Sequence, residues 1–303
     1  MKSSVSDLGA IGFAVAGFTF WVLADTSIKL AGQSKLPAYE VIAFLGLFVA
    51  GFLTVHALWR GQLRTLWPRH VQRQSIRSCL DLTNNLCVVV ALRHLSLTLF
   101  YILVFMAPMV IAILSTVFLR EGLPWRKAIA IVTGFAGVVI AVDPFGSAQQ
   151  GDWIGFAACM ACVACFSVNM VWSRVMTQTE RPESLTFFSG LVMTIAGFGL
   201  MLWHAEPLTL RLTGVLLAMG LFCAMGTVSF FIALKHTSAA NVSQYHYTQL
   251  LSGTLIAYLI WRDKPTPFMV LGGALIVGAG LYIAVAASRE RFRAVSVSPV
   301  VPD

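Results

Sequence analysis

Charged side chains are scarce in this sequence. Asp, Glu, Lys and Arg make up 11% of its 303 residues, whereas a soluble globular domain has about 25%. So little charge could not cover a surface that faces water, which excludes an ordinary soluble protein. The sequence instead has apolar runs of about 20 residues, long enough to cross a hydrocarbon core of about 30 Å as a helix. Because backbone polar groups in lipid must be satisfied within each run, we expect an all-α integral membrane protein.

The signatures of catalysis, nucleotide hydrolysis and metal binding are also missing. The sequence contains no Gly-rich phosphate loop, no paired His ligands and no nucleophile motif. We therefore expect no enzyme, no cofactor and no ATP-driven pump in this chain alone. Cys159, Cys162 and Cys165 share one helix face, but they lack the His or acidic neighbours of a metal site. Packing of small side chains between helices is the preferred interpretation over a metal cluster.

Two stretches of the chain, residues 91–142 and 233–285, repeat the same order of features. Each contains a small-residue turn, an apolar span, an Arg–acid pair, a Pro-containing turn and a Gly/Ala-rich apolar span. The residues that align without a gap are Ala91, Leu92, His94, Ser96 and Arg120 with Ala233, Leu234, His236, Ser238 and Arg262. A period this long indicates a duplicated half of a helix bundle.

The apolar runs predict ten helices with short connections. Their expected ranges are 9–30, 37–59, 74–92, 97–119, 125–142, 153–174, 184–203, 212–234, 239–261 and 267–287. The loops carry Pro, Gly or charge, and none is long enough for a soluble domain. We expect a first half at residues 8–144, a second half at 152–287 and a basic tail at 288–303.

The basic residues predict the orientation in the membrane. The net charge of +8 does not indicate nucleic-acid binding, because these residues lie between apolar runs. With a cytoplasmic N-terminus, 15 of the 21 Lys and Arg would lie inside and the other six outside. The positive-inside rule therefore places both termini in the cytoplasm. Five helices per half is an odd number, so the second half must cross in the opposite sense. Such inverted repeats are typical of secondary transporters and occur in channels too.

One stretch of the first half resembles a known family. ALRHLSLTLFYILVFMAP followed by LREGLPWRKAIAIVTGFAGVVIAV is similar to the drug/metabolite transporter superfamily, EamA type. In that family the fourth helix holds a mid-span Pro, here Pro108, and ends in a Glu, here Glu121. The fifth helix runs through spaced glycines, here Gly134 and Gly137.

The resemblance extends over residues 10–285, with some departures. The second half has Leu250 in place of the Pro and Asp263 in place of the Glu, and the first helix has Trp21-Val-Leu-Ala-Asp25 where Trp-Gly-x-Asn is common. The resemblance implies a ten-helix basket of two inverted five-helix repeats, with the pathway lined by helices 1, 3, 4, 6, 8 and 9. It also implies small-molecule transport, and within the resemblance amino-acid exporters, including those for aromatic amino acids, best fit a path lined by Tyr, Trp and Asn.

The third predicted helix carries a polar face. Asp81, Asn84 and Asn85 are spaced i, i+3, i+4 and lie on one side of the helix. An Asp at the centre of a membrane helix costs roughly 2.5–3.5 kcal/mol, so these side chains should face a cavity or other helices. They form either a hydrogen-bonding wall for a polar substrate or structural contacts. In the second case Asp81 would pair with Arg77, one turn away, and the Asn side chains would join helices.

The ninth predicted helix is the most polar of the ten. The candidate substrate-lining residues there are Asn241, Gln244, Tyr245, His246 and Thr248. Tyr245 offers an aromatic face with a polar tip. His246 is either a proton carrier or, as we prefer, a neutral side chain bonded across helices.

Aromatic, amide and carboxylate side chains on other helices complete the expected pocket. These are Trp21, Asp25, Tyr101, Asn169 and Trp172. They suit an amphipathic molecule such as an amino acid or a flat ring. The alternatives are that the aromatics lie at the membrane interface and that Asp25 pairs with Lys29.

Three residues are candidates for gating. Pro108 removes a backbone hydrogen bond in mid-helix and provides either a flexing point or a static kink. Glu121 and Asp263 end equivalent helices at opposite membrane faces. They would serve as latches or, as we prefer, as interfacial anchors.

These features together predict a secondary transporter of the bacterial inner membrane that works by alternating access. The expected substrate is a small neutral or zwitterionic metabolite, such as an aromatic amino acid, methionine or threonine, and the expected direction is export. Nucleobases, vitamins or cationic drugs are the alternative substrates, and a small-solute channel is the alternative class. The expected partners are the substrate and the lipid bilayer, without nucleic acid, and a monomer is the working assumption.

Overall fold

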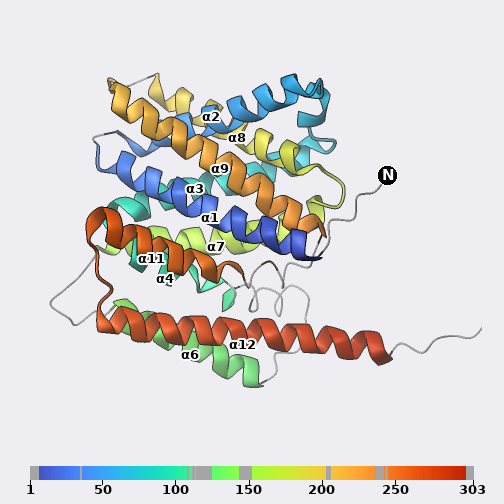
Figure 1. The fold of residues 1–303 in the computed structure, drawn as a ribbon, viewed down its shortest axis with the longest axis vertical. Helices are drawn as coiled ribbons and strands as arrows, with labels where there is room; N and C mark the ends of the chain where they lie inside the picture. Colours follow the sequence, from blue (N-terminus) through green and yellow to red (C-terminus); the bar gives the residue numbers. More distant parts are fainter. Residues whose placement is uncertain are drawn as a thin grey trace, which may run out of the picture.

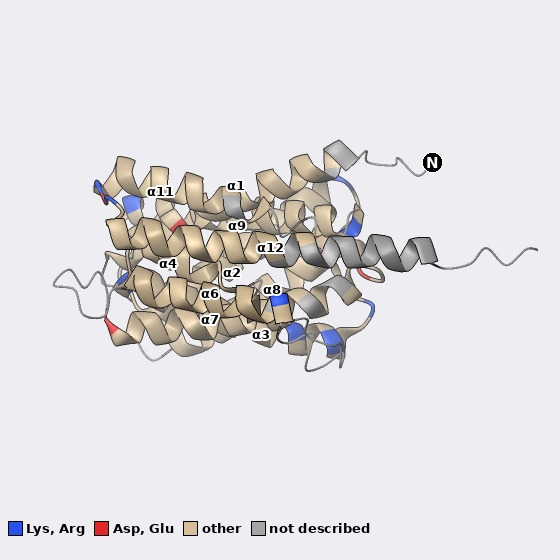
Figure 2. Ribbon diagram, turned by 90° about the horizontal axis from the view of Figure 1, so that it is seen from below, with Lys and Arg blue, Asp and Glu red and all other residues tan. Residues whose placement is uncertain are grey.

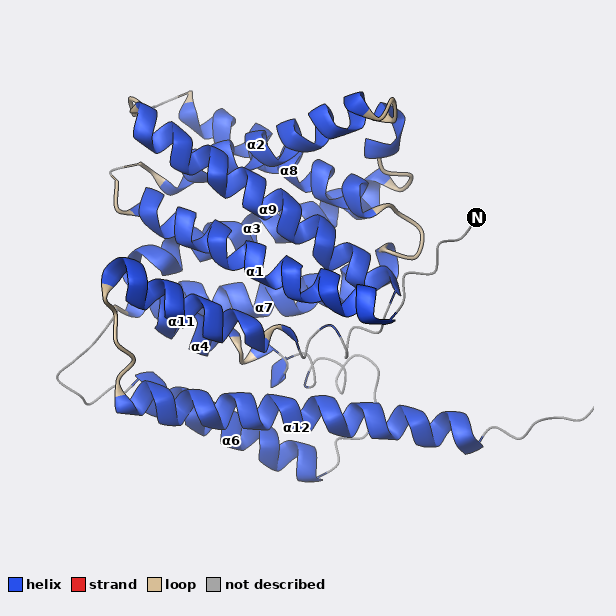
Figure 3. Ribbon diagram, in the orientation of Figure 1, coloured by secondary structure: helices blue, strands red, loops and turns tan. Residues whose placement is uncertain are grey.

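The computed structural model describes residues 7–34, 36–107, 109–110, 113, 125–142, 152–202, 206–236, 242 and 245–297. All regular structure in these residues is helical (Figure 3). The α-helices are α1 (Asp7–Gly32), α2 (Ala38–Trp59), α3 (Val71–His94), α4 (Leu97–Val104), α6 (Trp125–Val142), α7 (Trp153–Met176), α8 (Pro182–Met201), α9 (Leu210–His236), α11 (Tyr247–Trp261) and α12 (Pro267–Val297), with a 3₁₀ helix, η1, at Leu63–Leu66.

The prediction of an all-α membrane protein is confirmed. Six of the described helices, α1, α2, α3, α7, α8 and α9, are long and apolar enough to cross a membrane. Shorter apolar helical stretches lie in α6, α11 and α12. The helices lie side by side along one direction (Figure 1). Charged residues gather at the two ends of the bundle, and the middle is almost free of them (Figure 2).

Three predicted helix boundaries differ from the structure. α4 ends at Val104 and a turn follows at Phe105 and Met106, although we expected one helix over 97–119. The sequence supplies a reason, because Pro108 has no N–H to donate to the Val104 carbonyl, four residues before it. In the ninth predicted helix, a turn at His246 separates α11, which begins at Tyr247, from helical Val242 and Tyr245. α12 continues to Val297, into the expected tail.

The helices pack as two halves related by an approximate two-fold axis. The helices of the first half, in chain order, are α1, α2, α3, α4 and α6, and those of the second half are α7, α8, α9, α11 and α12. The contact of α1 with α9 has its counterpart in that of α7 with α3. Likewise α4 contacts α7 and α11 contacts α1, while α2 contacts α9 and α8 contacts α3. α2 packs on α8, and α6 packs on α12 at one edge of the bundle (Figure 1).

The two halves run in opposite senses. α1 begins at the right-hand end of the bundle in Figure 1, whereas its counterpart α7 begins at the left-hand end. α12 ends on the side where α1 begins. This arrangement agrees with the inverted repeat expected from five helices per half.

Two glycines bring α2 and α8 together on the approximate axis. Gly46 and Gly190 are each the ninth residue of their helix. A Cβ on Gly46 would lie 2.5 Å from the Gly190 carbonyl oxygen, and one on Gly190 would lie 3.0 Å from the Gly46 carbonyl oxygen. Small residues of this kind let membrane helices approach closely, so the crossing depends on the absence of side chains.

Loops at both ends of the bundle join the two halves. Buried Glu40 accepts a hydrogen bond from the backbone N–H of Glu206, at 2.9 Å. Buried Glu180 accepts hydrogen bonds from the backbone N–H groups of Arg69, at 3.0 Å, and His70, at 2.9 Å. Each glutamate thus satisfies backbone donors in a loop of the other half.

A cap fixes the start of α7 against the end of α3. Asp152 Oδ1 accepts a hydrogen bond from the backbone N–H of Gly155 at 3.0 Å, and its Oδ2 lies 2.7 Å from His94 Nδ1. These contacts, with the Gly155 N–H first, hold the pKa of Asp152 below its usual range. Asp at this position is a preferred N-cap.

We expect Gly46→Ala to destabilise the bundle, because the new methyl group would overlap the backbone of α8. Overpacking of this kind typically costs about 1–3 kcal/mol, so thermal unfolding in detergent should occur at a lower temperature than in the wild type. Gly51→Ala, further along α2, is the matched control, because nothing lies within 4 Å of its Cβ position. Equal melting temperatures for the two variants would contradict the close crossing.

Candidate functional site

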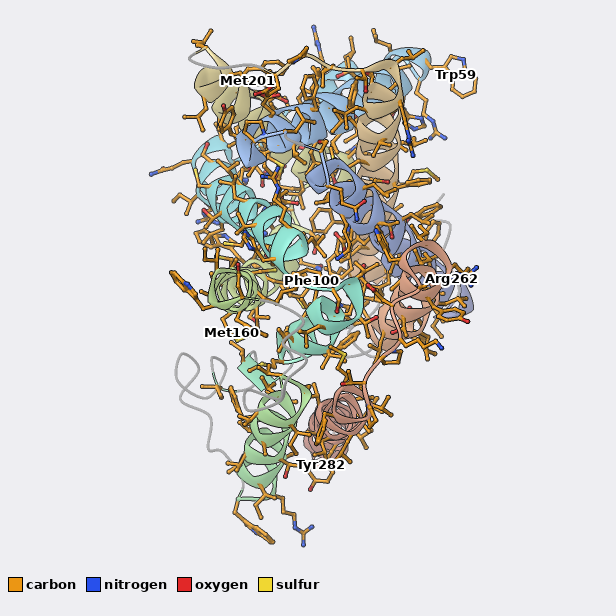
Figure 4. The ribbon with its side chains drawn as sticks, turned by 90° about the vertical axis from the view of Figure 1, so that its left-hand side faces the viewer. Trp59, Phe100, Met160, Met201, Arg262 and Tyr282 are labelled. Atoms are coloured by element: carbon orange, nitrogen blue, oxygen red, sulfur yellow. The ribbon has the colours of Figure 1, made fainter. Side chains whose placement is uncertain are left out.

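A cavity of about 150 Å³ lies in the interior of the bundle. Its lining comes from α1, α3, α4, α7, α9 and α11, the six helices that the family resemblance implied, with contributions from α2 and α8. None of the lining residues belongs to α6 or α12. In the end-on view of Figure 4, Phe100 of the lining lies near the centre of the bundle and Tyr282 of α12 lies at its lower rim.

Arg77 of α3 places a buried guanidinium on the cavity wall. Its side chain is 1% exposed. The guanidinium lies 5.6 Å from the ring centroid of Phe231. It donates hydrogen bonds to five neutral acceptors: Gln74 Oε1 at 3.2 Å, Asn169 Oδ1 at 3.4 Å, Ser173 Oγ at 3.4 Å, the Leu185 carbonyl at 2.9 Å and Ser189 Oγ.

Arg77 therefore has hydrogen-bond partners but no direct counter-charge. Within the part of the chain that the structure describes, ion pairs join only His70 to Glu180 and His94 to Asp152. A charged group inside a membrane protein normally pairs or faces a water-filled path, because desolvation is costly. The guanidinium thus keeps its charge while its N–H groups are bonded to neutral acceptors.

Asn169 of α7 lies between Arg77 and Asp81. Its Oδ1 accepts from Arg77, and its Nδ2 donates to Asp81 Oδ1 at 3.2 Å. The alternative that Asp81 pairs directly with Arg77 is therefore wrong for this conformation, because an amide from the other half separates the two charges. A positive and a negative group lie one helical turn apart on the same wall.

The neighbouring amides are engaged in helix contacts. Asn84 Oδ1 accepts a hydrogen bond from Cys162 Sγ at 3.4 Å, which joins α3 to α7. Asn85 Nδ2 donates to the backbone carbonyl of Asp81 at 2.8 Å. Both residues line the cavity, but only Asn84 joins two helices, because the Asn85 hydrogen bond lies within α3.

An aromatic wall faces these polar groups. Trp21 lies 4.8 Å from Phe230 between ring centroids, and its Nε1 donates to Thr227 Oγ1 at 3.1 Å. His246 stacks on Phe18 at 4.9 Å and lies 5.7 Å from Phe166. Trp21, Phe166, Phe230 and His246 line the cavity. Their flat faces could receive an apolar or aromatic group.

Asp25 and Tyr101 form a second polar group in the lining. The Tyr101 hydroxyl donates to Asp25 Oδ2 at 2.8 Å. Lys29 does not pair with Asp25, which was the alternative from the sequence. Its Nζ donates to the Leu95 carbonyl at 2.7 Å and lies 5.4 Å from the Trp261 ring centroid.

The cavity brings together about half of the residues that the sequence selected. The predicted residues in its lining are Trp21, Asp81, Asn84, Asn85, Tyr101, Asn169 and His246. Those that the structure places elsewhere are Trp172, Tyr245, Thr248 and Asp263. Those outside the described residues are Asn241, Gln244, Pro108 and Glu121.

Sequence reasoning missed Arg77 as a site residue. From the sequence we considered it only as a possible partner of Asp81, although it shares a helix face with Asp81 and Asn84 at i, i+4, i+7. That spacing was the available signal. Phe230 of α9 and Gln249 of α11 also line the cavity. No pattern in the sequence distinguished them, because Phe230 lies in a largely apolar segment and Gln249 in a generally polar one.

Comparison with known proteins connects this architecture to transporters. The sequence profile of the EamA-like transporter family matches residues 8–142 and again residues 153–285. The pseudopaline exporter CntI of Pseudomonas aeruginosa is 27% identical over 274 residues, which cover 89% of this chain and 94% of the exporter. The riboflavin transporter of Rhizobium johnstonii is 28% identical over 292 residues, 93% of each chain.

More distant matches extend the comparison. The S-adenosylmethionine uptake transporter of Rickettsia felis is 23% identical over 281 residues, 91% of this chain and 92% of the transporter. A solved crystal structure superimposes with a TM-score of 0.65 at 17% identity, over 92% of this chain and 98% of that one. At this identity the superposition shows a common fold.

We expect cavity thiols to react with a small water-soluble methanethiosulfonate faster than packed thiols do. Cys223 lines the cavity, whereas Cys159 is 0% exposed and its Sγ lies 3.9 Å from the Phe100 carbonyl. Single-cysteine variants that retain only Cys223 or only Cys159 should therefore be modified at different rates, as measured by mass spectrometry. A Cys223 rate as slow as that of Cys159 would show that water does not reach this cavity.

Proposed function

Because the chain belongs to the EamA-like transporter family, we propose that it moves a small zwitterionic metabolite, an amino acid or a close relative, across the bacterial inner membrane. The chain is a multi-pass membrane transporter of the drug/metabolite type and not an enzyme. It works without ATP, by alternating access of one cavity to the two sides. The two halves, residues 8–144 and 152–287, would move against each other around this cavity.

The observation that carries the proposal is the pair of opposite charges beside Asn169. Arg77 presents a guanidinium whose described partners are all neutral. A planar guanidinium is well matched to a carboxylate, which it can bind through two parallel hydrogen bonds. Asp81, one turn along α3, is placed to bind an ammonium group. An α-amino acid carries a carboxylate and an ammonium group on one carbon atom.

The aromatic wall supports an apolar or aromatic side chain on the substrate. With the charged end of the substrate at Arg77 and Asp81, its side chain would extend toward Trp21, Phe166 and Phe230. Tryptophan, phenylalanine and methionine match this wall best, and threonine matches it less well. The proposal narrows the sequence-based expectation from neutral or zwitterionic metabolites to zwitterionic ones.

A flat vitamin-like substrate is the second candidate. The aromatic wall and the similarity to a riboflavin transporter favour it. A neutral ring system without an anionic group would use the wall and leave Arg77 without a counter-charge. The dependence of binding on the substrate carboxylate therefore distinguishes the two candidates.

The proposed orientation has both termini in the cytoplasm. Lys and Arg are more frequent at the end of the bundle where α1 begins and α12 ends, which the positive-inside rule assigns to the cytoplasm. A phosphatase fused after Asp303 should therefore be inactive. Inverted symmetry makes the two faces of the carrier alike, so the gradients set the direction, and export is the direction expected from the sequence.

We expect Arg77→Gln to weaken binding of amino-acid substrates. A hydrogen bond to a charged group contributes about 1.5–3 kcal/mol, so the half-saturation concentration should rise roughly 10- to 100-fold. The measurement is counterflow of labelled tryptophan, phenylalanine, methionine and threonine in proteoliposomes. Arg73→Gln, one turn earlier in α3 where the side chain is exposed, is the matched control and should leave counterflow unchanged.

A substrate variant tests the same contact in the wild type, so the conclusion does not depend on the folding of Arg77→Gln. Tryptamine and tryptophan methyl ester lack the carboxylate and should compete with labelled tryptophan far less well than tryptophan itself. Competition by these compounds equal to that by tryptophan would contradict the assignment of Arg77. Counterflow by none of the four amino acids would remove the amino-acid proposal.

A further inference from the structure

Asp25 is the third charged group in the cavity lining, and the proposed substrate does not use it. The lining contains Arg77, Asp81 and Asp25. Arg77 and Asp81 are joined through Asn169, so their charges compensate each other at one site. A zwitterion bound there adds equal numbers of positive and negative charges. Asp25 therefore remains a surplus negative group in the substrate-loaded cavity.

The surroundings of Asp25 contain a hydrogen-bond donor but no paired cation within the described residues. The hydrogen-bond partner of its carboxylate among the described residues is the Tyr101 hydroxyl. Lys29, one turn away on α1, is bonded to the Leu95 carbonyl. Arg93 of α3 donates to the Leu36 carbonyl and is also engaged elsewhere. Neither cation forms an ion pair with Asp25.

The other titratable groups around α1 are also accounted for. They are Cys162 of α7, Cys223 of α9, His246 before α11, Asp81 and Arg77 of α3, and Glu40 of α2, which bonds to the loop before α9. His246 lies among Phe18, Phe105 and Phe166. Asp25 is thus the carboxylate in this lining that has neither a charged partner nor a bridging amide.

Filling the cavity changes the free energy of the Asp25 charge. In an empty cavity, water can hydrate a carboxylate. A substrate that occupies the cavity displaces this water, and a dehydrated carboxylate without a cation is costly. The cost disappears if the carboxylate takes up a proton and becomes a neutral carboxylic acid. Substrate binding and proton binding should then favour each other, because each lowers the cost of the other.

Tyr101 is placed to keep both forms of Asp25 accessible. A hydrogen bond to an ionised carboxylate stabilises the charged form, while desolvation favours the neutral form. The Tyr101 ring is 1% exposed. It packs so close to α11 that a Cβ on Gly253 would lie 2.3 Å from its Cε2 atom. The hydroxyl is therefore held toward Asp25 Oδ2, and Oδ1 remains for a proton.

We infer that Asp25 binds a proton that is transported together with the substrate, with Tyr101 as the residue that positions its carboxylate. This inference rests on the proposed function. Asp25 takes the proton from hydronium on the side where the substrate enters, leaving water, and returns it to water on the side where the substrate leaves. One proton and one zwitterion cross together. An inward proton gradient then drives uptake, so this inference opposes the direction of export expected from the sequence.

The Asp25→Asn variant tests proton coupling independently of substrate transport. In wild-type proteoliposomes with an acidic exterior and an alkaline interior, labelled tryptophan should accumulate above its external concentration. Asparagine mimics the neutral acid, so the variant should retain counterflow within about twofold, since exchange requires no net proton movement, and should lose accumulation. Its counterflow should also be independent of pH, whereas wild-type counterflow should fall at alkaline pH as Asp25 loses its proton.

Two further variants serve as controls. Asp152→Asn makes the same substitution outside the cavity and retains an N-cap residue, so accumulation should persist. Tyr101→Phe removes the donor that stabilises the charged form. The pH at which counterflow falls by half should therefore move upward, a change that a purely structural role would not produce.

The possible results of these experiments distinguish failure of the proton inference from failure of the proposed function. Counterflow in the wild type without any response to the pH gradient would overturn the proton inference and leave the proposed function standing. The inference would also be overturned if lysine, offered as a substrate, bound more tightly than tryptophan and this preference required Asp25. The positive charge beside Asp25 would then be the side-chain ammonium group of the substrate and not a proton. If none of the four amino acids undergoes counterflow, both the proton inference and the proposed amino-acid transport would be overturned. Accumulation in the wild type, lost in Asp25→Asn with exchange retained, would establish the inference.

Discussion

A guanidinium enclosed by helices must find hydrogen-bond acceptors on every side, and Arg77 meets this requirement across the boundary between the two halves. It belongs to α3, and its acceptors include Asn169 and Ser173 on α7 and the Leu185 carbonyl and Ser189 on α8. One side chain of the first half is thus held by two helices of the second. Because these acceptors are neutral, the contact fixes the position of the charge without cancelling it. Asp81, on the other side of Asn169, compensates this charge within the same cavity.

The inverted repeat explains why such a site can exist at the centre of the bundle. Equivalent helices of the two halves meet in pairs, so the innermost helices of both halves contribute to a single cavity. The close crossing of α2 and α8 at Gly46 and Gly190 brings the halves into direct backbone contact. Buried glutamates join loops of the two halves at opposite ends. In this conformation the halves are therefore held together at the centre and at both ends.

The polar and the aromatic groups of the cavity would recognise different parts of a substrate. For the proposed amino-acid substrate, the charged groups beside Asn169 would act on the part common to all amino acids, and the rings of Trp21, Phe166 and Phe230 would act on the part that differs. Hydrogen bonds discriminate strongly against a ligand that lacks a charged group, because buried partners are then left unpaired. Apolar contacts discriminate more weakly, since one methylene group contributes only about 0.8 kcal/mol. A site of this composition favours a chemical class over one individual metabolite.

The sequence by itself determined the membrane class, the helical content, the two halves and most helix boundaries. These properties depend on local quantities, namely the length of apolar runs, the positions of Pro, Gly and charge, and the period of polar residues on one helix. The i, i+3, i+4 spacing in α3 was enough to predict a polar face at Asp81. Only the tertiary structure decided what that face contacts. Arg77 and Asn169 are 92 positions apart, and Asp25 and Tyr101 are 76 apart. Which of several polar side chains meet in the interior depends on how the helices of two halves pack, and no periodicity within a single helix carries that information.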